Sequence, residues 1–344
     1  CCVSGAGAIN VDYKNRTVEI DGIVLKEGDY ISINGTTGEV YNGKVETKAA
    51  EVSGDFADLM ALCEKYTKLV VRTNADTPHD AQVARNFGAV GIGLCRTEHM
   101  FFEAEKIVAM REMILSPDAE GRKKALAKLL PYQKADFYGI FKAMDGCPVN
   151  VRLLDPPLHE FVPHDAKGQE EMAAAMGVSV QTIKQRVESL CEANPMLGHR
   201  GCRLGNTYPE ITEMQTRAIL GAAIQLKKEG GDPHPEIMVP LTGILYEFEA
   251  QEKVIRGTAA ELFAEEGIEI PFKVCTMIEI PRAALTANRI ASRAEYFSFG
   301  TNDLTQMTFG YSRDDIATFL PVYLEKKILK VDPFQVLDQN AVGQ

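Results

Sequence analysis

The pattern of hydrophobic and polar positions changes near residue 50. Before that point, short alternating segments flank turn residues, and a period of two with intervening turns predicts β-hairpins. One hairpin is expected from 11–13 with 17–20, and a second from 30–33 with 39–41. Because so few short strands cannot enclose a core, we expect residues 1–46 to belong to a larger β-rich domain.

After residue 50, amphipathic helical segments alternate with short runs of Val, Ile, Leu and Phe, which suit buried parallel strands. The predicted helices are 52–66, 78–87, 119–144, 210–229, 245–266 and 281–292. The predicted strands are 68–72, 90–95, 149–154, 236–241, 272–278 and 296–300, with a seventh candidate at 200–204. Repeated strand–helix units predict an α/β fold.

Polar residues at the predicted strand ends help to distinguish between two α/β architectures. Those at or just past a C-terminal strand end are Arg96, Arg152, Asp155, Glu279, Asn302 and Asp303. They come from four strands, which favours a (β/α)8 TIM-type barrel over a doubly wound sheet with one switch point. No convincing last strand precedes Gln344, so we expect a barrel over 47–344 that is incomplete at its C-terminus. Residues 155–194 read as an insertion on its active face.

Composition narrows the function classes. The formal net charge of −11 argues against a nucleic-acid-binding surface. No apolar run is long enough for a membrane span, and no signal peptide begins the chain. The eight cysteines form no CxxC pair, so we expect buried, reduced thiols and no zinc site. The expected compartment is the cytoplasm, with an organelle such as a plastid or glycosome as the alternative.

Three arginines are candidates for binding an anion, because guanidinium matches phosphate and carboxylate geometry. Arg96 ends a buried strand, and the alternative is a rim ion pair with Glu98 or Glu103. Arg152 lies within another apolar strand, where an internal ion pair with Asp155 is equally compatible. Arg200 follows a turn at 194–199, and the alternative there is a solvated structural loop.

Glu279 and Asp303 follow neighbouring predicted strands and could together bind Mg²⁺, which prefers one or two protein carboxylates plus ligand oxygens. The alternative is that each carboxylate caps the following helix. Gly300, Thr301 and Asn302 form a turn whose backbone N–H groups can approach an anion. The combined set suits a ligand with a phosphate, a carboxylate and a metal-chelating oxygen, such as phosphoenolpyruvate (PEP).

At these residues the sequence resembles the PEP-utilising enzymes. Tyr296–Gln306 is similar to the signature of that superfamily, and Gly93–Glu98 is similar to its second hallmark. Within the superfamily, Arg152–Phe161 and the insertion after it resemble the pyruvate phosphate dikinase family. They match the pyruvate–water dikinases and the first enzyme of the sugar phosphotransferase system less well.

The resemblance implies roles for individual residues. Arg96 and Arg152 would act on the phosphoryl group, and Arg200 and Arg313 match further arginines of the phosphotransferase relative. The residues that would contact the substrate are Gly300, Thr301 and Asn302. The metal, Mg²⁺, would be held by Glu279 and Asp303.

The implied reaction moves a phosphoryl group between PEP or pyruvate and a histidine on a swivelling domain. ATP and phosphate would act at a third, nucleotide-binding domain, within a homodimer. The family's general-acid cysteine would lie beyond Gln344, and none of the eight cysteines is assigned that role, so this chain alone is expected to be inactive. Two alternatives remain, namely a non-catalytic barrel used for dimerisation and the matching domain of a pyruvate–water dikinase.

Overall fold

A computed structural model of the chain describes residues 7, 9–20, 22–47 and 52–344. The chain divides into two units, residues 1–66 and residues 67–344, which are described separately. Among the described residues, no helix combines the length and the apolar character that crossing a bilayer would need.

The first unit contains short antiparallel strands, as the alternating pattern predicts. β1 (Ile9–Asp12), β2 (Thr17–Ile20) and β3 (Ile23–Lys26) form one sheet, and β4 (Ile31–Asn34) pairs with β5 (Glu39–Asn42). The two predicted hairpins are therefore confirmed, whereas β3 was missed. Helix α1 (Asp55–Glu64) follows. None of the described residues of this unit is buried. Whether residues 1–46 are the tail of a swivelling domain stays a prediction.

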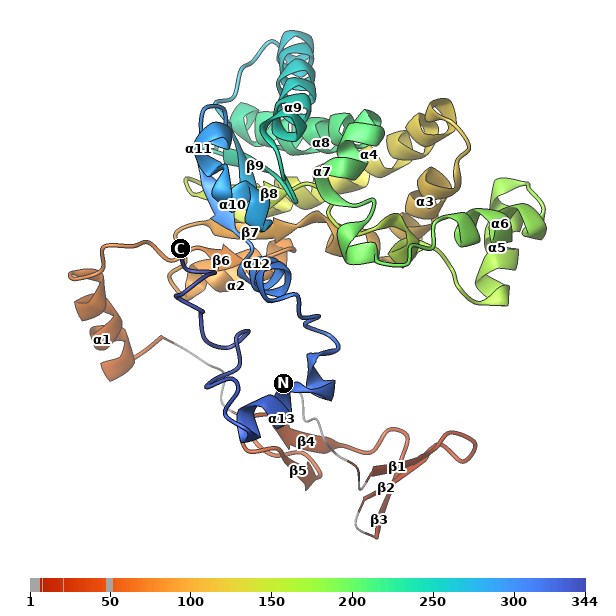
Figure 1. Ribbon diagram of the computed structural model, residues 1–344, viewed down its shortest axis with the longest axis vertical. Coiled ribbons are helices and arrows are strands. Elements are labelled where there is room, and N and C mark those ends of the chain that lie inside the picture. The colour runs from red at the N-terminus through yellow and green to blue at the C-terminus, as the bar shows by residue number, and fades with distance from the viewer. Residues whose placement is uncertain (1–6, 8, 21, 48–51) are drawn as a thin grey trace. The chain divides into compact units, whose positions relative to one another are not determined.

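The second unit is built on a six-stranded parallel sheet (Figure 1). Its strands are β6 (Thr73–Asn74), β7 (Ile92–Arg96), β8 (Pro148–Arg152), β9 (His234–Val239), β10 (Lys273–Ile278) and β11 (Phe297–Phe299). They lie in strict sequence order, and every neighbouring pair is parallel. A doubly wound sheet would reverse its order at a switch point, so that alternative is excluded for this sheet.

Helices connect these strands and cover the sheet. The main ones are α2 (Pro78–Asn86), α3 (Ala104–Leu115), α4 (Ala119–Ala143), α8 (Pro209–Lys228) and α9 (Leu245–Glu266). Smaller ones are α7 (Gly201–Thr207), α10 (Pro281–Leu285), α11 (Ala287–Ile290), α12 (Thr301–Phe309) and α13 (Leu320–Glu325). Short 3₁₀ helices are η1 (Thr97–Phe101), η2 (Leu158–Phe161), η3 (Pro195–Leu197) and η4 (Ile316–Thr318).

Two hydrophobic clusters hold this unit together. The larger lies between the sheet and helices α4, α8 and α9, and α8 packs against both α4 and α9 (Figure 1). It includes Val149 and Val151 of β8, Ile237 of β9 and Phe137 of α4. This packing is what the Val- and Ile-rich runs predict, because removing apolar surface from water stabilises the fold by about 25 cal/mol per Å².

The insertion at 155–194 forms η2 and the helical hairpin α5 (Ala166–Met176) and α6 (Val180–Ser189). The hairpin packs against α3, and the two share the second hydrophobic cluster. Phe161, 1% exposed, joins this cluster, and its ring stacks on Phe102 with centroids 5.4 Å apart. The insertion therefore has a core of its own, which holds η2 in place after β8.

Four details of the predicted elements were wrong. Residues 201–207 form helix α7, so the seventh candidate strand does not exist. The first strand begins at Thr73, and the predicted run before it is exposed, with Leu69 83% accessible. The predicted helix 281–292 is broken at Thr286 into α10 and α11, and α3 was missed.

The cysteines only partly follow the expectation of buried thiols. Cys95, Cys147, Cys202 and Cys275 are buried, but Cys63 and Cys191 are exposed. No disulfide joins any of the six cysteines that lie in the described ranges.

Candidate functional site

The predicted site residues follow the C-terminal ends of four strands of one parallel sheet. Arg96 of β7 and Arg152 of β8 are register partners, so these two strands end at the same level. Glu279 comes directly after β10, and Gly300–Asp303 come directly after β11. Because parallel strands all end at one edge, the sheet brings these segments to a common face.

Arg152 lies at the centre of a buried ion-pair network. Its Nη2 donates to Glu98 Oε1, and its Nη1 lies 3.0 Å from Asp155 Oδ2. Arg200 Nη2 donates to the same oxygen of Asp155 at 2.6 Å. Arg152, Asp155 and Arg200 are at most 8% exposed. The internal Arg152–Asp155 pair considered above is thus present, whereas Arg200 is not solvated.

Glu98 has a different partner from the one considered for it. It bonds Arg152 rather than Arg96, and the other candidate partner of Arg96, Glu103, pairs with Lys106 at 3.0 Å. Burial acts to lower the pKa of the Arg152 guanidinium, but the charges of Asp155 and Glu98 outweigh it and raise that pKa. The guanidinium therefore stays charged, and hydrogen bonds from a charged donor are stronger than neutral ones.

Glu279 is fully buried beside this network, and two local features fix its carboxylate. Its Oε1 accepts from the backbone N–H of Leu241 at 2.7 Å. Leu241 adopts a left-handed conformation (φ 62°), which costs a branched residue about 1–3 kcal/mol. Gly300 lies so close that a Cβ there would overlap Glu279 Oε2 and lie 2.6 Å from the Glu279 Cβ. Glycine is therefore needed at 300 for close approach.

Negative charge accumulates around Glu279. Burial, to which the charges of Asp155 and Asp303 add, raises the pKa of its carboxyl to about 8. Several buried atoms here have no protein partner, namely Glu279 Oε2, Asp155 Oδ1, Glu98 Oε2, Arg152 Nε and Arg200 Nε. Since buried polar atoms are normally satisfied, this set indicates a place for a polar or charged ligand.

The carboxylates fit a divalent cation. A cation between Glu279 and Asp303 would bond the orphaned Glu279 oxygen and offset the repulsion that raises its pKa. In the described part of the chain, no group of three or more His, Cys, Asp or Glu is arranged to hold a metal alone. Two carboxylates completed by ligand oxygens and water are the usual protein environment of Mg²⁺.

Comparison with known proteins identifies the family. Residues 50–344 match the family model described as PEP-utilising enzyme, PEP-binding domain. The chain belongs to this family.

Individual relatives point in the same direction. The chain is 56% identical over 343 residues to a pyruvate, phosphate dikinase of Giardia intestinalis, covering 100% of this chain and 39% of the relative. It is 54% identical over 345 residues to the pyruvate, phosphate dikinase of Clostridium symbiosum, covering 100% and 40%. A chloroplastic pyruvate, phosphate dikinase of Mesembryanthemum crystallinum is 55% identical over 347 residues, covering 100% and 37%. The chain thus spans about two fifths of these relatives.

The remaining predicted residues are not part of the buried cluster. Thr301 and Asn302 are exposed in the first turn of α12. Asp303 is also in that turn and is half-buried, but the N-cap is Gly300, so the capping alternative for Asp303 is wrong. The capping alternative is wrong for Glu279 too, since its bond goes to Leu241. Arg96 and Arg313 are exposed, and the Arg313 N–H donates to Gln306 Oε1 at 2.9 Å.

A cavity of about 900 Å³ opens between the insertion and α12 in the PEP-binding domain. Its lining includes His159, Glu160, Pro195, Met196, Met307 and Tyr311. Burial raises the pKa of Glu160, and the Arg200 charge opposes that shift. The cavity adjoins the ion-pair network, because Arg200 Nη1 lies 3.4 Å from the sulfur of Met196 in the cavity lining.

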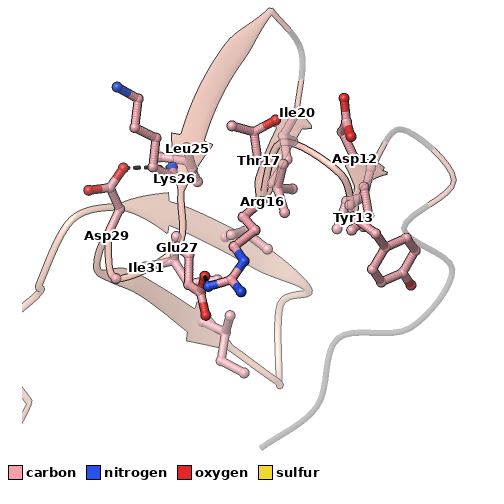
Figure 2. A pocket seen from close by; sticks show the side chains of 16 residues that line it. Asp12, Tyr13, Arg16, Thr17, Ile20, Leu25, Lys26, Glu27, Asp29 and Ile31 are labelled. Atoms are coloured by element: carbon pink, nitrogen blue, oxygen red, sulfur yellow. Dashed lines mark hydrogen bonds and ion pairs between the residues drawn. The ribbon is translucent and has the colours of Figure 1, made fainter.

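A second cavity, of about 730 Å³, lies in the first unit between β1–β3 and the β4–β5 hairpin. Figure 2 shows its side chains, among them Ile20, Leu25 and Ile31, and an ion pair joins Arg16 Nη1 to Glu27 Oε2 at 3.0 Å. Most of its surface is apolar, and none of the predicted site residues lines it. Its carboxylates are Asp12, Glu27 and Asp29, but the described lining residues include a single arginine rather than the pair that the predicted chemistry needs.

Sequence reasoning missed three residues that shape the site. These are Glu98 as a partner of Arg152, Leu241 as the donor to Glu279, and Gln215, whose side chain contacts both Thr97 and Leu154. Only Glu98 carried a signal, because it lies within the segment that resembles the family's second hallmark.

Proposed function

We propose that the chain supplies the PEP and pyruvate site of a pyruvate phosphate dikinase. The full reaction would convert ATP, pyruvate and phosphate to AMP, PEP and diphosphate, by phosphoryl transfer through a phosphohistidine. The family membership and the identity of 54–56% over the whole chain support the proposal. The phosphohistidine and nucleotide-binding domains would belong to the same full-length protein, which would act as a homodimer.

The observation that carries the proposal is the buried cluster at the strand ends. Two arginines and a fully buried glutamate converge there, and each retains an unsatisfied polar atom. Leaving such atoms without a partner costs about 1–3 kcal/mol each, so a pure scaffold would gain by replacing them. A ligand that bears phosphate and carboxylate oxygens, together with a cation, would satisfy donors and acceptors alike.

Each residue then has a role that follows from its chemistry. Arg96 and Arg152 would bind the phosphoryl oxygens, with Arg200 and Arg313 as further cations. Gly300, Thr301 and Asn302 would contact the substrate, since the turn at the start of α12 offers backbone N–H groups. Glu279 and Asp303 would hold Mg²⁺. When bound, Mg²⁺ would supply charge neutralisation at the phosphoryl and enolate oxygens.

The arginines contribute electrostatic stabilisation that requires no reorganisation during transfer. Arg152 is held by two carboxylates, and its position is therefore set before a ligand binds. Phosphoryl transfer depends on such positioning and charge stabilisation more than on covalent chemistry by the protein. This chain's residues would bind and orient the substrate, while the phosphoryl acceptor would come from the carrier domain.

We also propose a finer fold and a cellular setting. The six parallel strands would form part of a (β/α)8 barrel over 47–344, and residues 1–46 would be the β-rich tail of the swivelling domain. The strict strand order supports the barrel, because successive strands of a barrel are neighbours. The proposed compartment is the cytoplasm, with a plastid as the alternative, since one relative is named as chloroplastic.

Calorimetry with PEP, or with oxalate as an enolate mimic, tests the proposal in the presence and absence of Mg²⁺. We expect Mg²⁺-dependent binding by the wild-type chain and its loss in Glu279→Ala. Glu261→Ala is the matched control, because Glu261 is an exposed carboxylate that pairs with Arg217 on the outside of α9. A folded wild-type protein that binds neither ligand would contradict the proposal and favour a non-catalytic module, as would binding that Glu279→Ala leaves unchanged.

A further inference from the structure

Gln215 joins β7 and β8 beyond the point where their backbone pairing ends. The last register partners of these strands are Arg96 and Arg152. Past that pair, Gln215 Nε2 donates to Thr97 Oγ1 at 3.0 Å, and the Leu154 backbone N–H donates to Gln215 Oε1 at 2.8 Å. One amide therefore uses its donor for the chain after β7 and its acceptor for the chain after β8.

The amide is held rigidly where it makes these bonds. Gln215 is 1% exposed and Thr97 is 0% exposed, so water does not compete for either hydrogen bond. Gln215 lies within α8, a helix of 20 residues that packs against both α4 and α9. The two strand ends are thus tied to the most enclosed helix of the unit rather than to a loop.

The two residues that Gln215 bonds are next in sequence to charged residues of the site. Thr97 stands between Arg96 and Glu98, and Leu154 directly precedes Asp155. Glu98 and Asp155 are the carboxylates that hold Arg152. A shift of either strand end would therefore move a carboxylate relative to the guanidinium that it orients.

We propose that Gln215 is a positioning residue, which sets the spacing of the Arg96 and Arg152 strand ends and thereby aims Arg152 at the phosphoryl group. The inference rests on the proposed function for its ligand, PEP. Gln215 itself touches neither ligand nor metal in this role. The role needs a side chain that hydrogen-bonds two segments at once, at a length that reaches both.

Two substitutions separate this role from a general contribution to packing. Gln215→Met keeps the length and apolar stem but loses both hydrogen bonds. Gln215→Glu keeps the acceptor for Leu154 and can accept from the Thr97 hydroxyl, which is free to rotate. Gln251→Met is the matched control, because Gln251 is also 1% exposed and also makes two side-chain hydrogen bonds of 2.8 Å, a buried one with Thr212 and a half-buried one with Asn206.

The experiment measures PEP affinity by calorimetry with Mg²⁺ on the full-length protein and all three variants. We expect affinity about tenfold weaker in Gln215→Met, a partial recovery in Gln215→Glu, and wild-type affinity in Gln251→Met. Equal affinity in Gln215→Met and wild type would overturn the inference, as would an equal loss in Gln251→Met. If Gln215→Met does not fold, Thr97→Val decides, because it removes the hydroxyl partner of Gln215 Nε2 while Gln215 stays in place. An affinity equal to that of wild type in Thr97→Val would overturn the inference.

A ligand-independent measurement separates this inference from the proposed function. If the wild-type protein binds no PEP, the proposed function fails, and crystal structures of wild type and Gln215→Met then decide the inference. We expect the Arg152–Glu98 contact to be lost or lengthened in Gln215→Met and kept in Gln251→Met. An unchanged contact in Gln215→Met would overturn the positioning role whatever the ligand proves to be.

Discussion

At the scale of single residues, the close approach of Gly300 to Glu279 is the feature that a small change disturbs most directly. In Gly300→Ala, the new Cβ overlaps the Glu279 carboxylate and must displace it from the Leu241 N–H. We expect the free energy of unfolding to fall by about 1–3 kcal/mol, as for other overpacked sites. Mg²⁺-dependent PEP binding should weaken as well. Urea denaturation and calorimetry measure the two effects.

Gly257→Ala is the control for this prediction. Gly257 lies inside α9, is exposed, and has no atom within 4 Å of an added Cβ. Alanine there should stabilise the protein by roughly 0.5–1 kcal/mol, because it restricts the unfolded chain and favours helix. The two glycine substitutions should therefore differ in sign. A Gly300→Ala protein as stable as wild type, with unchanged ligand affinity, would show that Glu279 is not confined as described.

Buried and exposed cysteines should differ in the reactivity of their thiols. Burial raises the pKa of the Cys95 thiol, with the charges of Asp76 and Glu98 adding to the shift, and burial raises the pKa of Cys202 to about 12. A raised pKa keeps the thiol neutral, so the nucleophilic thiolate is scarce at about pH 8. Iodoacetamide applied to the native protein should label Cys63 and Cys191 and spare Cys95 and Cys202. Peptide mapping checks this, and early labelling of Cys202 would contradict it.

The sequence located most candidate site residues on strand ends and named Asp155 as a partner of Arg152, but it missed the partners Glu98 and Leu241. Arg152 and Glu279 were recognisable because each follows or ends an apolar run of strand length. The bond from Arg152 to Glu98 joins residues 54 positions apart, and the one from Leu241 to Glu279 joins residues 38 apart. Such pairings depend on strand register and rotamers that no local pattern specifies. Whether these residues bind PEP and Mg²⁺ stays a prediction.

At the scale of elements, helix α4 shows how strongly a cap fixes a boundary. Its N-cap, Asp118, accepts from the Gly121 N–H at 2.8 Å and so satisfies one of the free donors of the first turn. We expect Asp118→Ala to lower the free energy of unfolding by about 1 kcal/mol, measured by urea denaturation. Asp118→Ser should retain most of the stability, because serine also caps well. Equal losses in both variants would exclude capping as the cause.

Elements are predictable from the sequence where they are long and where a cap fixes their start. Helix 119–144 was predicted within a residue of its observed bounds, since a long periodic segment follows a capping residue. The short segment 200–204 was interpreted as a strand but starts helix α7. Arg200 is drawn inward by Asp155, and Gly201 adopts a left-handed conformation (φ 57°) in contact with Leu241. Those tertiary contacts decide the structure of a segment too short to have a period.

At the scale of the whole molecule, the sequence was sufficient for the α/β class and for parallel strands in the second unit. The long runs of Val, Ile and Leu demand cover by helices, and repeated units demand parallel pairing. Neither the doubly wound nor the barrel order follows from those runs alone. The strand-end arginines and carboxylates pointed away from the doubly wound order, because they come from four strands rather than from one switch point. The observed strand order agrees.

The two units should differ sharply in local stability. The described residues of the first unit include none that is buried, whereas the second contains a core with Val149, Val151 and Ile237 at 0% exposure. Local opening of a strand exposes little apolar surface in the first unit. In the second unit it breaks the larger hydrophobic cluster. In hydrogen exchange with mass spectrometry on the 344-residue chain, amides of β1–β5 should exchange at least about a hundredfold faster than those of β8–β10. The amides of helices that pack on these strands, such as α8, should exchange as slowly as those of β8–β10, because they share the same hydrophobic cluster. Equal protection of β2 and β8 would mean that the first unit gains stability from interactions other than burial of its own side chains.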